Sequence, residues 1–408
     1  MPGSRLAAIA FDDAQRMLSA DVPFPTTTEI VPVFKCAGHI LAERIGAQHD
    51  LPGADSSAMD GYAIRYEDFE PGKILPVQAR CSACALPVPL STGHATRVFT
   101  GAAMPAHADT VVMQEYVRES AAGIEIMTAP RAGQHVRMRG EDVRTGQLLL
   151  PAGTLLRPAQ IALMSAQGID RVSVFAKLRV GILTTGDEVV LPGNTRTAQQ
   201  TFDSNGPMLA ALVEGMGASV SRITHARDNE PQIQSALAQM LPHCDLIVSA
   251  GGTSSGERDL VRATIEALGA TMSTWQVRMK PGKPLALATV AGKPFVGLPG
   301  NPAAAFAVFT LLITPLIRRM QGRTALFPPT PRFALDLDKN GHAYRDEFLR
   351  VVSVTDESGS TRLVPLAQQS PSALGSLAAA SGLARIRPGG TVTRGDAVPY
   401  YDFQHWLA

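Results

Sequence analysis

The chain is poor in cysteine: only Cys36, Cys81, Cys84 and Cys244 occur among its 408 residues. Cys81 and Cys84 form a single CxxC pair. A structural zinc site usually needs four ligands, often from two such pairs, and no second pair is present. The cysteines are therefore interpreted as ordinary reduced thiols rather than as a metal site.

Charge and long apolar runs are also scarce. Charged residues make up 18% of the chain, and 37 basic against 36 acidic side chains give a net charge of +1. This balance excludes a globally basic nucleic-acid coat and a polybasic membrane binder. The most apolar stretch, 303–317, is interrupted by Thr310, Thr314 and Pro315 and falls short of the ~18 residues of a membrane span. With no long apolar N-terminal region, we expect a cytoplasmic protein without nucleic-acid or membrane partners.

The length and the zones of composition predict several domains. At about 150 residues per domain, 408 residues suggest two to four. We expect a multidomain α+β protein whose central α/β domain has a mainly parallel sheet with flanking helices. An inserted β domain and a small C-terminal β-barrel complete it. The expected boundaries are 1–47 plus 141–177 for a discontinuous linker domain, 48–140 for the β insert, 178–326 for the α/β domain and 327–408 for the barrel.

The α/β zone alternates apolar strand-like runs with helical periods, which indicates a parallel sheet covered on both faces. Ser204 or Asn205 is expected to cap a helix over 207–216. Elsewhere we expect a helix near 11–18, a short helix near 40–45 and a turn at 338–341.

Ligands of such sheets bind beyond the carboxyl ends of the strands, and the loops expected there are polar and rich in glycine. Backbone N–H groups of these loops can approach an anion without obstruction by a Cβ atom, and Lys280 and Lys283 can supply compensating charge. The candidate substrate-binding residues are Gly251, Gly252, Ser254, Ser255, Gly256, Pro299, Gly300 and Asn301. Neither a P-loop nor a dinucleotide-binding GxGxxG is present.

Three acids, Glu188, Asp228 and Asp259, follow strands at the same expected edge. Carboxylate oxygens beside phosphate suit Mg²⁺, so these three are the candidate metal ligands. Asp187 is interpreted as a helix cap. Acids, lysines and glycine loops in one place indicate metal-assisted phosphate chemistry.

Eight short motifs, in order along nearly the whole chain, resemble the molybdopterin molybdenumtransferase family, which includes the E domain of gephyrin. They are SAMDGYA at 57–63, TG at 100–101, GED at 140–142, TGDE at 185–188, DSN at 203–205, GG at 251–252, KPGKP at 280–284 and GLPGNP at 297–302. Each motif alone is weak, but their ordered combination is highly specific.

The resemblance implies a four-domain protomer and a homodimer with the site at the subunit interface. It implies that molybdate is inserted into the dithiolene of adenylylated molybdopterin, with Mg²⁺ involved and AMP released. The family's catalytic positions correspond here to Asp60, Thr100, Asp142, Glu188, Asp228, Asp259, Lys280 and Lys283. An adenylyltransferase and acceptor molybdoenzymes are the further partners considered.

Two departures from the family pattern occur. The glycine loop carries Thr253 where the family has valine, and Ser381 stands where the family usually has Asn or Asp.

Two alternative functions stay open at this point. The α/β zone also resembles molybdopterin adenylyltransferases, although those are single-domain enzymes. A non-enzymatic scaffold, as gephyrin is at synapses, is the other.

Overall fold

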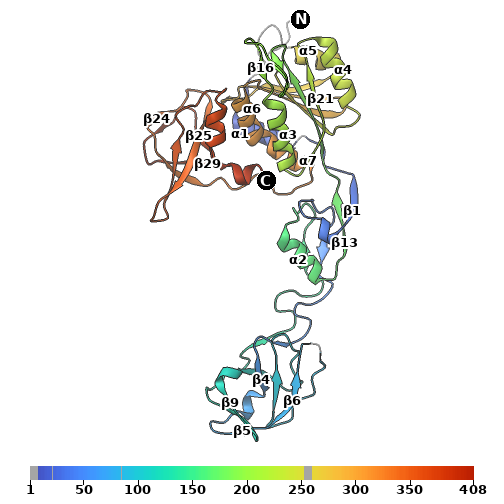
Figure 1. The fold of residues 1–408 in the computed structure, drawn as a ribbon, viewed down its shortest axis with the longest axis vertical. Coiled ribbons are helices and arrows are strands. Elements are labelled where there is room, and N and C mark those ends of the chain that lie inside the picture. Colours follow the sequence, from blue (N-terminus) through green and yellow to red (C-terminus); the bar gives the residue numbers. More distant parts are fainter. Residues whose placement is uncertain (1–7, 21, 84, 252–259) are drawn as a thin grey trace. The chain divides into compact units, whose positions relative to one another are not determined.

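The structure is a computed structural model that describes residues 8–20, 22–83, 85–251 and 260–408. The chain folds into two compact units, which are described separately (Figure 1). Unit 1 comprises Met1–Glu43, Ala152–Ile161 and Arg171–Ala408, and unit 2 comprises Arg44–Pro151 and Ala162–Asp170.

The centre of unit 1 is a six-stranded sheet in which three of the five strand pairings are parallel. In spatial order its strands are β17 (Ser219–Ala226), β14 (Arg179–Thr185), β18 (Leu246–Ala250), β22 (Lys293–Leu298), β21 (Pro284–Val290) and β19 (Thr271–Gln276). The antiparallel pairings involve β21. The mainly parallel sheet predicted from sequence is confirmed.

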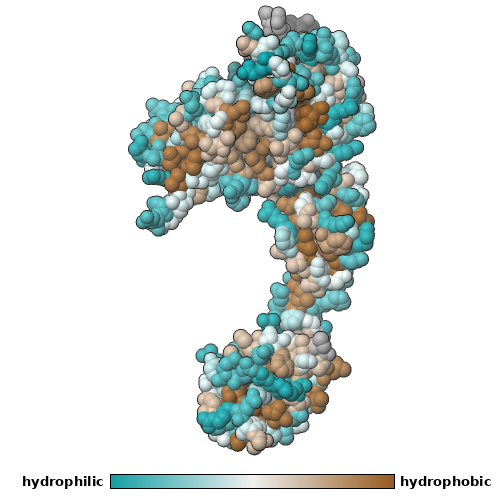
Figure 2. All heavy atoms as spheres, in the orientation of Figure 1, coloured by the Kyte–Doolittle hydropathy of each residue, from teal (hydrophilic) through white to brown (hydrophobic). Residues whose placement is uncertain are grey.

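Neighbouring residues of each strand point to opposite faces of the sheet, so the apolar strands present apolar side chains on both faces. Helices cover both of these faces. Ile182 belongs to one apolar cluster, with α3 (Asn205–Gly215), whereas Leu183 belongs to a second cluster, with α4 (Glu230–Met240) and α5 (Leu260–Ala267). The side chains of Ile182 and Leu183 are both fully buried. Hydrophilic residues cover the solvent side of α4 and α5 (Figure 2). This two-sided burial explains why the strands read as continuous apolar runs.

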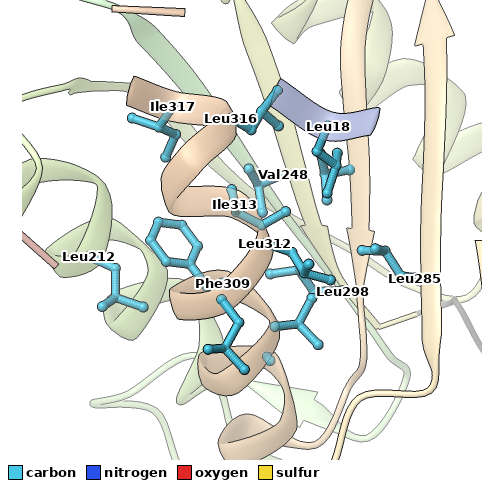
Figure 3. Close-up of a cluster of buried hydrophobic side chains, with 14 of the residues drawn as sticks. Leu18, Leu212, Val248, Leu285, Leu298, Phe309, Leu312, Ile313, Leu316 and Ile317 are labelled. Atoms are coloured by element: carbon cyan, nitrogen blue, oxygen red, sulfur yellow. The ribbon is translucent and has the colours of Figure 1, made fainter. Parts of the chain in front are cut away.

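One long helical segment lies at the heart of the first cluster (Figure 3). It consists of α6 (Pro302–Val308), the π-helical η4 (Phe309–Ile313) and α7 (Thr314–Met320). Pro315 has no N–H to donate to the carbonyl of Leu311, four residues earlier. Gln15 Nε2, from α1 (Phe11–Ala20), donates to that carbonyl instead, at 2.8 Å. The helix therefore continues through Pro315.

This segment, Pro302–Met320, is long and apolar enough to span a membrane by length and composition alone. However, 89% of its most apolar window is buried inside the protein. Phe309, Leu312 and Ile313 are fully buried among the labelled side chains of Figure 3. Its apolar character is thus explained by its place in the core.

The C-terminal part of unit 1 forms a closed barrel, as predicted. A six-stranded sheet runs in the order β20 (Met279–Lys280), β25 (Asp346–Thr355), β26 (Thr361–Pro365), β23 (Arg332–Leu335), β29 (Ala397–Asp402) and β27 (Gly382–Ile386), and β27 also pairs with β25. The turn expected at 338–341 is wrong, because Lys339–Asn340 is strand β24 and pairs with β28 (Thr391–Val392).

Unit 2 contains the predicted β domain. One sheet has the order β6 (Val77–Cys81), β7 (Ala95–Val98), β4 (Gly61–Ile64) and β8 (Thr110–Met113). The other has the order β5 (Ile74–Leu75), β10 (Gly123–Ile126) and β9 (Val117–Ser120). Short pairings join β3 (Ser56–Ser57) to β11 (Val136–Arg137) and β2 (Ile45–Gly46) to β12 (Leu148–Leu150).

The remaining segments include the expected helix α2 (Pro158–Ala166) and the antiparallel pair β1 (Thr28–Pro32) and β13 (Arg171–Phe175). The short helix expected near 40–45 is wrong: Ile40 and Leu41 form bridges to Leu155 and Val174 instead. The four-domain boundaries stay a prediction. The other short elements are η1 (Val33–Lys35), η2 (Tyr66–Asp68), η3 (Gln114–Tyr116), β15 (Val189–Val190), β16 (Thr201–Phe202), α8 (Leu374–Ala379) and α9 (Phe403–Trp406).

Replacing Gln15 with alanine removes the donor that satisfies the buried Leu311 carbonyl. We expect Gln15→Ala to lower the free energy of unfolding by about 1–3 kcal/mol, measured by urea denaturation. Gln234, exposed on α4, is the matched control, and Gln234→Ala should change stability by less than about 0.5 kcal/mol. Equal effects of the two substitutions would contradict this account of the π-helical segment.

Candidate active site

A cavity of about 680 Å³ lies in unit 1 at the carboxyl ends of the parallel strands. Thr185, Ala250 and Leu298, which end β14, β18 and β22, mark this edge of the sheet. The cavity is lined by Thr184, Thr185, Gly186, Glu188, Val189, Thr201, Phe202, Asp203, Ser204, Asn205, Asp228, Ala250, Gly251, Pro284, Pro299, Gly300, Asn301, Pro302, Ser372 and Leu374. The edge predicted from sequence is therefore the edge that holds the cavity.

Part of the cavity wall is backbone. Gly251 has a φ of +96°, and a Cβ atom there would lie 2.7 Å from the Thr185 carbonyl oxygen, so only glycine fits without a shift. A Cβ atom on Gly300 would lie 3.6 Å from the Gly251 Cα, which shows how closely these two loops approach. Asn301 occupies the N-cap position of the long helical segment, without a side-chain capping bond. A helix N-terminus favours an anionic ligand.

Asp203 holds this wall together, a role that the sequence analysis missed. Its side chain is buried; Oδ2 accepts from Thr184 Oγ1 at 3.0 Å, and Oδ1 accepts from the Gly206 N–H at 2.9 Å. Asp203, not Ser204 or Asn205, thus provides the capping side chain of α3, and that expectation is wrong. Because the Thr184 hydroxyl proton goes to Asp203, its contact of 3.2 Å with His225 Nδ1 requires His225 to donate.

Asn205 links two loops of the cavity. Its Nδ2 donates to the Gly300 carbonyl at 2.8 Å. Its Oδ1 is buried and has no hydrogen-bond partner among the described residues. The amide orientation that reaches Gly300 therefore leaves an acceptor for which the described chain supplies no donor.

Acidic side chains also line the cavity. Glu188 and Asp228 both line the cavity, and the Asp228 N–H donates to Asp187 Oδ1 at 3.3 Å. Partial desolvation, followed by the like charges of Asp187 and Glu188, raises the pKa of Asp228. No helix begins at Asp187, so its interpretation as a helix cap is wrong. Among the described residues, no group of three or more His, Cys, Asp or Glu side chains could hold a metal ion.

The two candidate lysines are absent from the cavity lining. Lys280 lies in β20, in parallel register with Glu347 of β25, and its Nζ is 3.0 Å from Glu347 Oε1. The buried Glu347 carboxylate also meets Lys339 Nζ at 3.3 Å. Lys283 is exposed, and its carbonyl accepts from the Val277 N–H. In this structure Lys280 thus forms a salt bridge with a residue of the barrel sheet.

Two of the three candidates in unit 2 form a pair. Asp60 Oδ1 accepts from the Thr100 N–H at 2.7 Å and from its hydroxyl at 2.8 Å. These bonds, the backbone one first, hold the pKa of Asp60 below its ordinary value. Asp142 is exposed, and its N–H donates to the Leu51 carbonyl.

The remaining candidates Gly252, Ser254, Ser255, Gly256 and Asp259 lie outside the described residues. In the C-terminal part of unit 1, Ser372 lines the cavity, and its hydroxyl is 3.0 Å from that of Ser370. Ser381, a departure from the family pattern, accepts from the Ser353 N–H and from the Tyr400 hydroxyl, each at 2.8 Å. Ser381 therefore has a structural role inside the barrel.

The fold and this cavity define a class, that of multidomain proteins built around a molybdopterin-binding domain. Family profiles match along the chain: "MoeA N-terminal region (domain I and II)" at residues 9–168, "Probable molybdopterin binding domain" at 181–319 and "MoeA C-terminal region (domain IV)" at 334–403. The chain belongs to the molybdopterin molybdenumtransferase family, as its sequence motifs predicted. It is accordingly a transferase enzyme of molybdenum cofactor biosynthesis.

Individual relatives support this assignment. A molybdopterin molybdenumtransferase of Nostoc sp. is 40% identical over 72% of this chain and 70% of its own length. Its namesake from Haemophilus influenzae is 34% identical over 80% of this chain and 81% of its own length. A crystal structure of the molybdopterin biosynthesis MoeA protein from Pyrococcus horikoshii covers 97% of this chain and 99% of its own, with 30% identity and a TM-score of 0.78.

The Asp60–Thr100 pair can be tested by titration. In Thr100→Val one of the two bonds to Asp60 is lost, so its pKa should rise toward the ordinary 3.8. A carboxylate with a lowered pKa stabilises the folded state at neutral pH, and this contribution disappears as the pH falls through the lowered pKa. Carbon-detected NMR of the aspartate carboxyl groups measures the shift.

A matched pair in the same unit serves as the control. Asp50 Oδ1 accepts from the Thr145 N–H at 2.7 Å and hydroxyl at 2.9 Å, and with Arg139 these bonds lower the pKa of Asp50 to about 2. Thr145→Val should raise the pKa of Asp50 and leave Asp60 unchanged. An unchanged Asp60 pKa in Thr100→Val would refute the proposed pairing.

Proposed function

We propose that this enzyme inserts molybdate into the dithiolene of adenylylated molybdopterin and releases AMP. The observation that carries the proposal is the cavity of about 680 Å³, which combines glycine backbone, a helix start and two carboxylates at one edge of the sheet. Its volume is within the ~300–1,000 Å³ typical of small-molecule sites. The backbone wall suits phosphate groups, and the acids suit a bound cation.

In chemical terms, two sulfur–molybdenum bonds form while one molybdate oxygen leaves as water with the two thiol protons. Water splits the phosphoanhydride into AMP and the phosphate of molybdopterin. Gly251, Gly300 and Asn301 bind the phosphate groups, and the free Asn205 Oδ1 accepts from a donor of the substrate. Pro299 shapes the same loop. Lys280 and Lys283 supply positive charge to the oxyanions when substrate is bound.

We propose Mg²⁺ as the cofactor, held by Glu188 and Asp228 together with Asp259. Burial, followed by the like charges of Asp187 and Glu188, raises the pKa of Asp228. The contribution of these like charges supports this fit, because a cation relieves repulsion among them. Mg²⁺ commonly takes one or two protein carboxylates, with waters and phosphate oxygens completing its shell. When bound, it neutralises charge developing on the phosphoanhydride.

We further propose a cytoplasmic homodimer, in which Asp60, Thr100 and Asp142 of one protomer complete the site of its partner. The support is chemical: the Asp60–Thr100 pair is exposed, polar and held in one geometry by two hydrogen bonds. Such an arrangement is suited to contact a ligand rather than to stabilise a core.

The test is AMP release from adenylylated molybdopterin by the full chain. Release should require molybdate, stop when EDTA removes divalent cations, and recover when Mg²⁺ is restored in excess. Release without molybdate, or in the presence of the chelator, would overturn the corresponding part of the proposal. Formation of adenylylated product from ATP and metal-free molybdopterin would favour an adenylyltransferase instead.

Substitution of a cavity acid provides a second test. Glu188→Gln should reduce the rate of AMP release by at least about tenfold, because a carboxylate of the cavity loses its charge. Glu214, an exposed glutamate on α3 outside the cavity, is the matched control, and Glu214→Gln should retain the activity. Equal activities of the two variants would exclude Glu188 from the site.

A further inference from the structure

Two arginines and two aromatic rings gather on one sheet face of unit 2, whose strands β4 and β6 are labelled in Figure 1. Arg97 is the direct cross-strand partner of Arg80 in β6 and of Tyr62 in β4. Direct partners point to the same face of a sheet, so these three side chains stand in a row. Phe99 follows Arg97 by two residues and lies on the same side.

The guanidinium groups stack on the rings. The Arg97 Cζ atom is 5.0 Å from the Tyr62 ring centroid and 5.2 Å from that of Phe99. The Arg80 Cζ atom is 6.0 Å from the Phe99 ring centroid. These contacts stabilise two like charges on neighbouring strands without neutralising either of them.

No salt bridge within the part of unit 2 that the structure describes includes Arg80 or Arg97, although, after the two bonds from Thr100, the charge of Arg97 also helps to lower the pKa of Asp60. Two acids of the same unit are engaged elsewhere: Glu119 accepts from the Tyr62 hydroxyl and Asp60 accepts from Thr100. Arg97 Nη2 donates to Gln114 Oε1.

Arg97 Nη1 is buried and has no hydrogen-bond partner among the described residues. Buried donors are nearly always satisfied in folded proteins, and an exception requires an explanation. An acceptor supplied from outside the chain is an explanation that also fits two neighbouring arginines without a salt bridge.

We propose that Arg80 and Arg97 form an oxyanion-binding site that takes a phosphate or molybdate group. The planar guanidinium fork matches tetrahedral oxyanions, and stacking on Tyr62 and Phe99 fixes the fork before the ligand arrives. Thr100, the residue after Phe99, places the site beside the Asp60–Thr100 pair. That the bound oxyanion is a substrate group rests on the proposed function, whereas binding itself does not.

Titration calorimetry of the full-length protein tests this site with two probes, inorganic phosphate alone and molybdate alone. Arg80→Gln and Arg97→Gln should each weaken binding of at least one probe by about tenfold, since each removes a charge-assisted contact. A selective loss for phosphate assigns the site to the nucleotide phosphate groups. A selective loss for molybdate assigns it to the metal oxyanion.

Arg118 of β9 supplies the matched control, because it is exposed and paired with Glu125 at 3.2 Å. Arg118→Gln should bind both probes like the unaltered protein. Arg80 is exposed, so Arg80→Gln still tests the site if Arg97→Gln unfolds the protein. Circular dichroism verifies that each variant is folded. Unchanged affinities in folded Arg80→Gln, or an equal loss in Arg118→Gln, would overturn the site. If the Arg80 and Arg97 variants lose affinity as expected but the unaltered protein releases no AMP, only the proposed function would be overturned.

Discussion

The buried carboxylate of Asp203 is the constraint on which the cavity of unit 1 depends. One of its oxygens holds the Thr184 hydroxyl at the end of β14, and the other holds the first turn of α3 through the Gly206 N–H. A buried carboxylate is costly unless its oxygens are satisfied, so strand end and helix start are coupled. The same helix start carries Asn205, whose amide reaches the Gly300 carbonyl. Through these bonds the side chains of Asp203 and Asn205 link the end of β14, the start of α3 and the Gly300 loop.

The general architecture could be predicted because it follows from patterns that local physics enforces. Strands buried on both faces read as continuous apolar runs, and the alternation of Ile182 and Leu183 between the two clusters is the structural counterpart of that pattern. The edge that holds the cavity follows from the same alternation, since parallel strands end together. Glu188, Asp228 and Gly300, which were predicted on this ground, line the cavity.

What could not be predicted depends on partners distant in sequence. Pro315 normally indicates a break, but Gln15, nearly three hundred residues away in the chain, satisfies the carbonyl that proline frees. In the sequence, Asp203 is one of several polar residues that could cap the helix. The bond from the Thr184 hydroxyl to its carboxylate holds Asp203 in the capping position. Lys280 reads as part of a cavity loop, yet its register with Glu347 makes it an edge residue of the barrel sheet. Register between distant strands leaves no local signal.

The net charge of the chain is close to zero, but each unit contains a local cluster of charges of one sign, acidic in unit 1 and basic in unit 2. In unit 1, burial and then the nearby charges of Asp187 and Glu188 raise the pKa of Asp228. In unit 2, Arg80 and Arg97 stand side by side, and neither forms a salt bridge among the described residues. Each cluster is unfavourable alone, and a ligand of opposite charge would relieve the repulsion within it. Net charge therefore excludes a uniformly charged surface, but it says nothing about local clusters of one sign.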